Sequence, residues 1–261
     1  MSTTLGALRA RTVRLADISA EDRRRWAELS GRALEPNLFL DPGYLHTAHP
    51  WRPKLRHTSL VVVEDRNSMR GLLPLSIQPR SRQLPFRHAS TSGPVLRSGG
   101  PLHTPLVDKD HPRAVLSHLL QYLSSSASGL PGLVELANFP GSGPLYDTFH
   151  AVSARWRVPT IERWRFEYAV THLGEREDWR SGLSKGRRKN LQRYARRMQT
   201  ELGELEIEDC GSDCAAFDEF VELEASGWKG ERGNALRRSE SSHGWHRDMV
   251  EEFRARGQFH L

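Results

Sequence analysis

TSLVVVEDRNSMRGLLPLSIQ, residues 58–78, is the stretch that decides the fold. Two apolar runs, 58–64 and 69–78, flank the polar interval DRNS, and this pattern predicts a β-hairpin. Pro74 lies inside the second run and has no N–H to donate to a neighbouring strand. We therefore expect the second strand to form a sheet edge or to contain a bulge.

Helices are predicted on both sides of the hairpin. Residues 19–33 begin with a serine that can cap a helix, followed by acidic residues in the first turn. Residues 111–125 and 144–156 carry apolar residues at helical spacing. Two further helices are expected at about 212–226 and 242–256. The chain therefore alternates helices with extended segments.

Shorter extended segments are predicted along the rest of the chain. Residues 81–110 give only short strand signals among Pro, Gly, Ser and His, and 132–139 indicates a buried strand. Residues 160–170 predict a long strand, and 203–210 alternates Leu and Ile with Glu, which is typical of a half-exposed strand. Residues 257–261 are interpreted as the start of another strand.

This alternation predicts an α/β (α+β) fold with layers of helices on a sheet. Residues 36–45 are expected to be a loop anchored by Phe39 and Tyr44. A composition change near 157 divides the chain into a first unit, 1–156, and a second unit, 157–261.

Composition restricts the class of protein. The chain has 261 residues, a formal net charge of +6 and an ordinary hydrophobic fraction of 37%, which argues against wholesale disorder. We find no signal peptide and no apolar run of about 20 residues that could span a bilayer, so a cytoplasmic protein is expected. Two cysteines are too few for a structural zinc site, and two histidines, His243 and His246, lack a carboxylate at fixed spacing. No metal is expected.

The most unusual segment is LSKGRRKNLQRYARRMQ, residues 183–199, with seven basic residues between Lys185 and Arg197. It also contains apolar residues at helical spacing, which predict an amphipathic helix docked on the protein. Those apolar residues are Leu191, Tyr194, Ala195, Met198 and Leu202. A ladder of like charges at i,i+4 spacing costs such a helix about 1 kcal/mol, which packing can offset.

Several roles are open for the basic helix. It can be a solvated face without a ligand, or a site for an anion that relieves the charge repulsion. Nucleic acid is disfavoured because no aromatic platform, zinc-finger, RRM or helix-turn-helix pattern accompanies the basic residues. A membrane surface is disfavoured because the apolar face is narrow. A small phosphate-bearing ligand ranks above both.

Two short motifs resemble a known family. The first contains Ser184, Lys185, Arg188, Lys189 and Asn190, and the second contains Glu224, Trp228, Lys229, Gly230 and the pair Ala235-Leu236. Their order and spacing resemble the GNAT-superfamily N-acyltransferases of the CelD/BioF-like type, which are related to the FemAB aminoacyltransferases. Stretches 36–45 and 71–75 also look like that family's N-terminal half.

The resemblance implies a tandem of two GNAT-like domains, each a mixed sheet flanked by helices. It also implies acyl-CoA as co-substrate, with transfer of an acyl group, expected to be acetyl, to a small-molecule or cell-envelope amine. GNAT enzymes hold the cofactor pyrophosphate on a glycine-containing loop at a helix N-terminus. That pattern is not found here, so we expect the second domain to be incomplete, with its loop beyond Leu261.

The resemblance also implies site residues. Acyl transfer to an amine needs a group that removes the amine's proton, and Glu224 is the expected base if burial raises its pKa. The expected cofactor- or substrate-binding residues are Lys185, Arg188, Lys189, Trp228, Lys229, Tyr44 and His103. The alternative function is a non-catalytic module that binds an anion or nucleic acid through residues 184–198.

Overall fold

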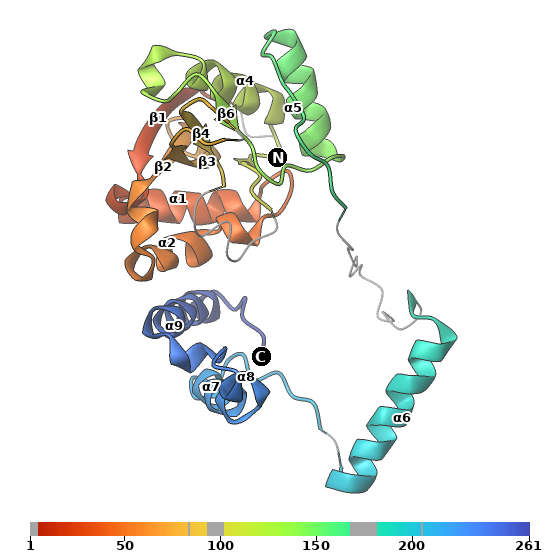
Figure 1. Cartoon of the computed structure of the whole chain (residues 1–261). Coiled ribbons are helices and arrows are strands. Elements are labelled where there is room, and N and C mark those ends of the chain that lie inside the picture. The colour runs from red at the N-terminus through yellow and green to blue at the C-terminus, as the bar shows by residue number, and fades with distance from the viewer. Residues whose placement is uncertain (1–4, 83, 93–101, 168–181, 205) are drawn as a thin grey trace.

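The hairpin predicted at 58–78 forms the centre of a mixed sheet. The computed structural model describes residues 5–82, 84–92, 102–167, 182–204 and 206–261. Within these residues a six-stranded sheet has the order β1-β2-β3-β4-β6, with β5 also paired to β3 (Figure 1). All pairs are antiparallel except β4 and β6. The strands are β1 Arg9–Arg14, β2 Thr58–Glu64, β3 Met69–Gln78, β4 His88–Ser90, β5 Leu106–Val107 and β6 Val134–Glu135.

β3 is an interior strand and not a sheet edge, but it does contain an irregularity, so only the first of the two alternatives expected from Pro74 was wrong. β3 pairs with β2 along one side. On its other side it pairs with β5 at Gly71 and Leu72 and with β4 from Ser76 to Gln78. Pro74 lies in the interval between these two partners, where no ladder residue stands opposite it on that side. The interval explains how an interior strand tolerates a residue without an N–H. The irregularity in the hairpin register lies elsewhere, between Val63 and Glu64.

Helices cover both faces of the sheet. On one face, α1 (Ala20–Gly31) and α2 (Pro42–Trp51) pack over Leu60, Val62 and Leu72. On the other face, α4 (Pro112–Leu123) and α5 (Pro144–Arg155) pack over the alternate residues of the same strands. The predicted helices 19–33, 111–125 and 144–156 are therefore confirmed, and the mixed α/β fold class with them. Single 3-10 turns occupy Leu15–Asp17, Leu38–Leu40, Pro53–His57, Ser126–Ser128 and Leu236–Arg238.

Helix α2 corrects the prediction of a loop at 36–45. The Asp41 side chain accepts a hydrogen bond from the Gly43 N–H at 2.7 Å, and Pro42 occupies the first helical position. An aspartate N-cap followed by proline is a helix start signal, because the proline lacks an N–H that the first turn would leave unpaired. The aromatic anchors Phe39 and Tyr44 do contact each other edge to face, with ring centroids 5.3 Å apart.

A buried ionic cluster ties α1 to the sheet. The fully buried Asp108 carboxylate accepts hydrogen bonds from Arg32 at 2.8 Å and from Arg70 at 2.9 Å. Arg70 also donates to Asp65 at 2.9 Å. Burial opposes ionisation of Asp108, but hydrogen bonds from Arg32, the Asp110 backbone N–H and Arg70 outweigh it and hold its pKa below the usual value. The charges are thus paired, as buried charges must be.

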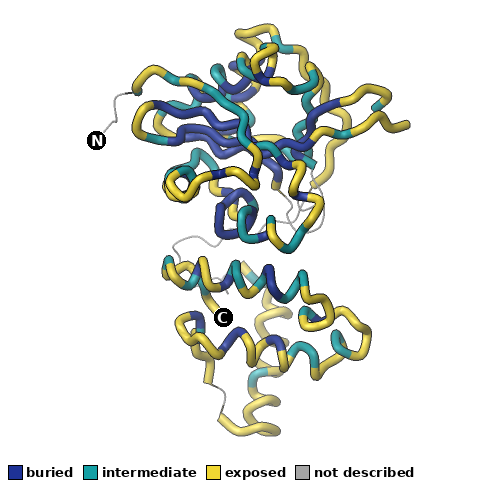
Figure 2. The backbone as a smooth tube through the Cα atoms, turned by 90° about the vertical axis from the view of Figure 1, so that its left-hand side faces the viewer, coloured by how far each residue is buried: buried dark blue, intermediate teal, exposed yellow. Residues whose placement is uncertain are grey.

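The described residues of the C-terminal part form four α-helices. They are α6 Lys185–Leu202, α7 Ala216–Ser226, α8 Trp228–Glu231 and α9 Glu240–Ala255. Helix α9 lies along α2, and Figure 2 shows the two side by side. Side-chain hydrogen bonds join them: Trp245 Nε1 donates to the Tyr44 carbonyl at 3.2 Å, Trp51 Nε1 donates to Asp248 at 2.6 Å, and Arg256 donates to Asp41 at 2.7 Å. The division of the chain at 156 and 157 stays a prediction.

Several predicted strands were wrong. The strand at 132–139 is reduced to Val134–Glu135, and residues 160–167 are exposed and form no strand. The described residues of 203–210 and residues 257–261 form none either. Residues 168–170 and 205, and residues 83 and 93–101 of the segment 81–110, lie outside the described residues. Segments 203–210 and 257–261 do meet, because the Cys210 N–H donates to the Leu261 carbonyl at 2.9 Å, but among the described residues they form no strand ladder.

None of the helices that the structure describes is long and apolar enough to cross a membrane.

Candidate functional site

The corner between α7 and α8 gathers three of the predicted site residues. The Glu224 side chain is only 8% exposed, and its carboxylate accepts hydrogen bonds from Lys229 Nζ at 2.6 Å and from the Leu236 backbone N–H at 2.8 Å. Helix α7 ends at Ser226 and α8 begins at Trp228, so Glu224 and Lys229 meet across this tight turn. The corner is therefore a defined polar site.

Gly230 allows the corner to be this tight. A Cβ placed on Gly230 would overlap the Ala225 carbonyl group, which leaves room for glycine alone. The Trp228 ring is 58% exposed, and the guanidinium of Arg232 lies 5.3 Å from its centroid. Lys229 Nζ lies 6.0 Å from the same ring. The corner thus presents an aromatic face and two cations to solvent.

The expectation that burial raises the pKa of Glu224 was wrong. The Leu236 N–H and the Lys229 ammonium both stabilise the carboxylate, and they hold the pKa of Glu224 below its ordinary value despite the burial. Glu224 is therefore ionised at neutral pH. A carboxylate with both oxygens engaged is a weak proton acceptor until one of these donors moves away.

Lys185, Arg188 and Lys189 lie together on the first turns of α6. The helix begins at Lys185, where the Ser184 side chain caps it by accepting a hydrogen bond from the Arg187 N–H at 3.3 Å. All three side chains are exposed. Their cations lie near the amino end of the helix, where the free N–H groups also favour an anion.

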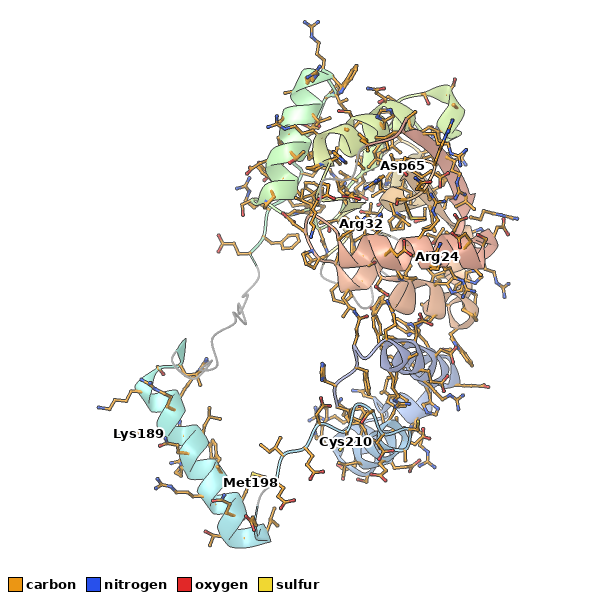
Figure 3. The ribbon with its side chains drawn as sticks, turned by 180° about the vertical axis from the view of Figure 1, so that it is seen from behind. Arg24, Arg32, Asp65, Lys189, Met198 and Cys210 are labelled. Carbon is orange, nitrogen blue, oxygen red and sulfur yellow. The ribbon has the colours of Figure 1, made fainter. Side chains whose placement is uncertain are left out.

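The prediction that α6 docks through its apolar stripe was wrong. The helix buries none of its residues. The stripe stays in solvent, with exposed fractions of 47% for Leu191, 53% for Tyr194, 43% for Met198 and 80% for Leu202. Figure 1 shows α6 apart from the sheet and from α7–α9, and Figure 3 shows Lys189 and Met198 on it, away from Arg32 and Asp65 in the sheet region. Sequence periodicity identified the stripe but could not supply its partner.

Tyr44 and His103 lie in the part of the chain that contains the sheet. Tyr44 is buried between Phe39 and Trp245, at 5.3 Å and 5.1 Å between ring centroids, and burial raises its pKa. His103 is buried as well. It lies between Leu102 and Thr104, whose carbonyl oxygens both accept hydrogen bonds from Asn37. The Tyr44 side chain is therefore part of the packing between α2 and α9.

The structure therefore brings Glu224, Trp228 and Lys229 together, and groups Lys185, Arg188 and Lys189 on a different helix. It does not bring these two groups into contact, nor does it join either to Tyr44. Sequence reasoning missed the role of the Leu236 N–H as a partner of Glu224. The pair Ala235-Leu236 was part of the second motif, but its backbone contact twelve positions away has no sequence signal.

The described residues contain no group of His, Cys, Asp and Glu that could hold a metal ion. Cys210 and Cys214 are both free thiols.

Part of the chain matches a known protein family. Residues 185–261, which span α6 to α9, match the model of the acetyltransferase (GNAT) domain. No curated protein and no solved structure matches the chain. The match supports the GNAT superfamily for the C-terminal part, which contains both the basic helix and the Glu224 corner.

Proposed function

We propose that this protein takes part in N-acyl transfer, moving an acyl group, expected to be acetyl, from acyl-CoA to an amine. The observation that carries the proposal is the GNAT acetyltransferase match over residues 185–261. In this reaction the amine nitrogen attacks the thioester carbonyl, a C–N bond forms and the C–S bond breaks. The amine loses one proton, and the departing thiolate takes one up.

The basic residues of α6 fit the phosphate groups of acyl-CoA. The helix carries seven cations and one acid, Glu201, which pairs with Arg197 at 2.6 Å. Lys185, Arg188 and Lys189 are exposed on the first turns. None of the three forms an ion pair with a residue that the structure describes. Phosphate groups would relieve the repulsion along this face.

The α7–α8 corner would bind the acceptor amine. Glu224 is ionised, so in our proposal an incoming alkylammonium replaces Lys229 on its carboxylate. The same carboxylate first takes one proton from the ammonium, which frees the neutral amine to attack, and the second proton, released as the amide forms, passes to the departing thiolate. Trp228 would cover the acceptor's apolar part. In this scheme the Leu236 N–H keeps Glu224 in position.

The test is release of free thiol from acetyl-CoA by the full chain with a panel of amines. Glu224→Gln should lower kcat by about 100-fold, because general-base catalysis typically contributes at least that factor. Glu222→Gln is the matched control, since Glu222 is on the same helix but exposed and paired with Arg237. Equal activity of the two variants, or no amine-dependent thiol release by the unmodified protein, would contradict the proposal.

A second candidate is a non-catalytic module that binds a polyanion through residues 184–198. The seven cations of α6 favour it, because the helix buries none of its residues. Binding of duplex and single-stranded oligonucleotides would be measured at increasing salt, because phosphate contacts make log K fall linearly with log salt. Absence of binding at low salt would remove this candidate. A nucleic-acid partner is not our expectation, and a cytoplasmic location remains a prediction.

A further inference from the structure

Two short segments outside the GNAT match are rich in cations and free of acids. RPKLRH, residues 52–57, contains Arg52, Lys54 and Arg56. PRSRQLPFRH, residues 79–88, contains three arginines and a histidine. The segments are more than twenty positions apart in sequence. Neither takes part in the acyl-transfer proposal.

The sheet brings these segments to one end of the β-hairpin. The first immediately precedes β2, and the second immediately follows β3, its antiparallel partner. Thr58 at the start of β2 is paired with Ser76 near the end of β3. β1 ends at the same place with Arg14, opposite Ser59. The register therefore places cations from three elements around one end of the sheet.

These residues line an open groove with a volume of about 890 Å³. Its lining residues are Arg14, Arg56, His57, Ser59, Ile77, Pro79, Arg80 and Arg87. Four arginines and a histidine thus face one space, with a hydroxyl, a proline ring and an aliphatic side chain between them. The lining contains no acid.

Most of these cations are not neutralised. Arg14 pairs with Asp17 at 2.6 Å. Arg56, Arg80 and Arg87 form no ion pair with any residue that the structure describes. Arginines elsewhere on the same fold behave differently: Arg24 pairs with Glu21 and Glu28, and Arg32 pairs with Asp108. The groove therefore carries positive charge that the described acidic residues mostly leave unneutralised.

We propose that this groove binds a small ligand that carries two or more phosphoryl groups. A guanidinium donates two parallel N–H groups to a phosphate, and several separated guanidinium groups need several separated anionic centres. A single carboxylate would leave most of them unpaired. The volume is within the range of small-molecule sites. The lining has no Phe, Tyr or Trp on which bases could stack, which disfavours a nucleic-acid strand.

The test is equilibrium binding of tripolyphosphate and of ATP to the full chain at low salt. Both should bind with one site in the groove. Arg80→Ala with Arg87→Ala should weaken both by about 10-fold or more, since a charge-assisted hydrogen bond contributes enough for that factor. Arg113→Ala with Arg155→Ala is the matched control. It removes the same charge from exposed positions on α4 and α5 and should leave affinity within about twofold.

Two further measurements make the test decisive. Arg80→Lys with Arg87→Lys keeps the charge but loses the paired donors, and it should give an intermediate affinity. Equal losses in the groove and control variants would mean that only net charge matters and would overturn the proposal. So would an oligonucleotide that binds more tightly than tripolyphosphate and is lost in the groove variant. No residue of α6 to α9 lines the groove. The test of acyl transfer and the test of ligand binding in the groove can therefore give different outcomes.

Discussion

Helices α4 and α6 have the same kind of sequence and opposite surroundings. Both carry an apolar stripe at helical spacing. In α4 the stripe is buried against the sheet, through Val115, Leu116, Leu119, Leu120 and Leu123. In α6 no residue of the stripe is buried, and all but Ala195 are exposed. The spacing of apolar residues therefore predicts a helix and its inner face, whereas burial depends on a partner that lies far away in the sequence.

The two helices must also be stabilised differently. Packing on the sheet stabilises α4. The stabilising contacts of α6 are local: the Ser184 cap and the pair of Arg197 with Glu201 at 2.6 Å. Because most of the stability of helices in proteins comes from tertiary packing, α6 should be only marginally stable without it. Stability should therefore respond very differently to the same substitution in the two helices.

The largest difference is expected for leucine truncation. Leu116→Ala in α4 should lower the free energy of unfolding by about 4 kcal/mol, because it removes fully buried methyl groups and leaves a cavity. Leu191→Ala in α6 should change it by less than about 0.5 kcal/mol, because that side chain is already half exposed. Denaturant unfolding followed by tryptophan fluorescence measures both. Similar losses would show that α6 is packed in solution.

Ion pairs should show the same contrast. Asp108→Asn should cost about 3 kcal/mol, because Arg32 and Arg70 lose a buried negative partner. Glu201→Gln, which removes the exposed partner of Arg197 on α6, should cost less than about 0.5 kcal/mol.

The Asp108 contribution should also depend on pH. The pKa of Asp108 is lowered in the folded protein, so its ionised form stabilises the fold at every pH above the unfolded value, about 3.9. That stability is lost as the pH falls through the lower folded pKa. Unfolding curves at decreasing pH should therefore converge for the unmodified protein and Asp108→Asn below about pH 4. A constant difference down to pH 2 would contradict this.

Helix α9 extends the comparison, because it belongs to the GNAT-matched part yet packs on α2. A Cβ on Gly244 would overlap the Trp51 ring, whose Nε1 donates to Asp248. Gly244→Ala should therefore cost about 2 kcal/mol.

The control is Gly186→Ala in α6, where a Cβ meets no atom of the described chain within 4 Å. It should stabilise α6 by up to about 1 kcal/mol, because alanine favours a helix more than glycine does. The two substitutions should change stability in opposite directions, which unfolding curves and far-ultraviolet circular dichroism can measure. Such a result would confirm that α9 is docked and α6 is not.

The same distinction explains how far the sequence predicts this molecule. The hairpin, α1, α4 and α5 were predictable because turn residues, a serine cap and leucine spacing are local signals. Helix α2 was missed although Asp41 and Pro42 carry a recognisable start signal. Residues 160–167 could not be placed, because an alternating segment becomes a strand only beside another strand.

The contacts of the candidate site also fall into those that local sequence predicts and those that depend on the fold. The motif residues Glu224 and Lys229 are close in sequence, and their contact across a turn follows from local geometry. The Leu236 N–H that lowers the pKa of Glu224 was not predictable, because it reaches Glu224 only through the path of the intervening chain. The groove at the hairpin end depends on strand register, which joins segments 52–57 and 79–88.

The smallest expected effect concerns the helix caps. Ser184→Ala removes the acceptor of the Arg187 N–H and should cost α6 about 1 kcal/mol. With no tertiary packing to hold the helix, amide exchange across Lys185–Leu202 should speed up about fivefold.

Ser19→Ala removes the matching cap from α1, where Ser19 accepts from the Asp22 N–H at 3.0 Å. It should lower global stability by a similar amount while the α1 amides stay protected, because Trp26 and Leu29 remain buried in the core. If the α6 amides instead exchange only with global unfolding, α6 must be docked in solution, and its exposed stripe would then need a partner that the sheet of this fold does not supply.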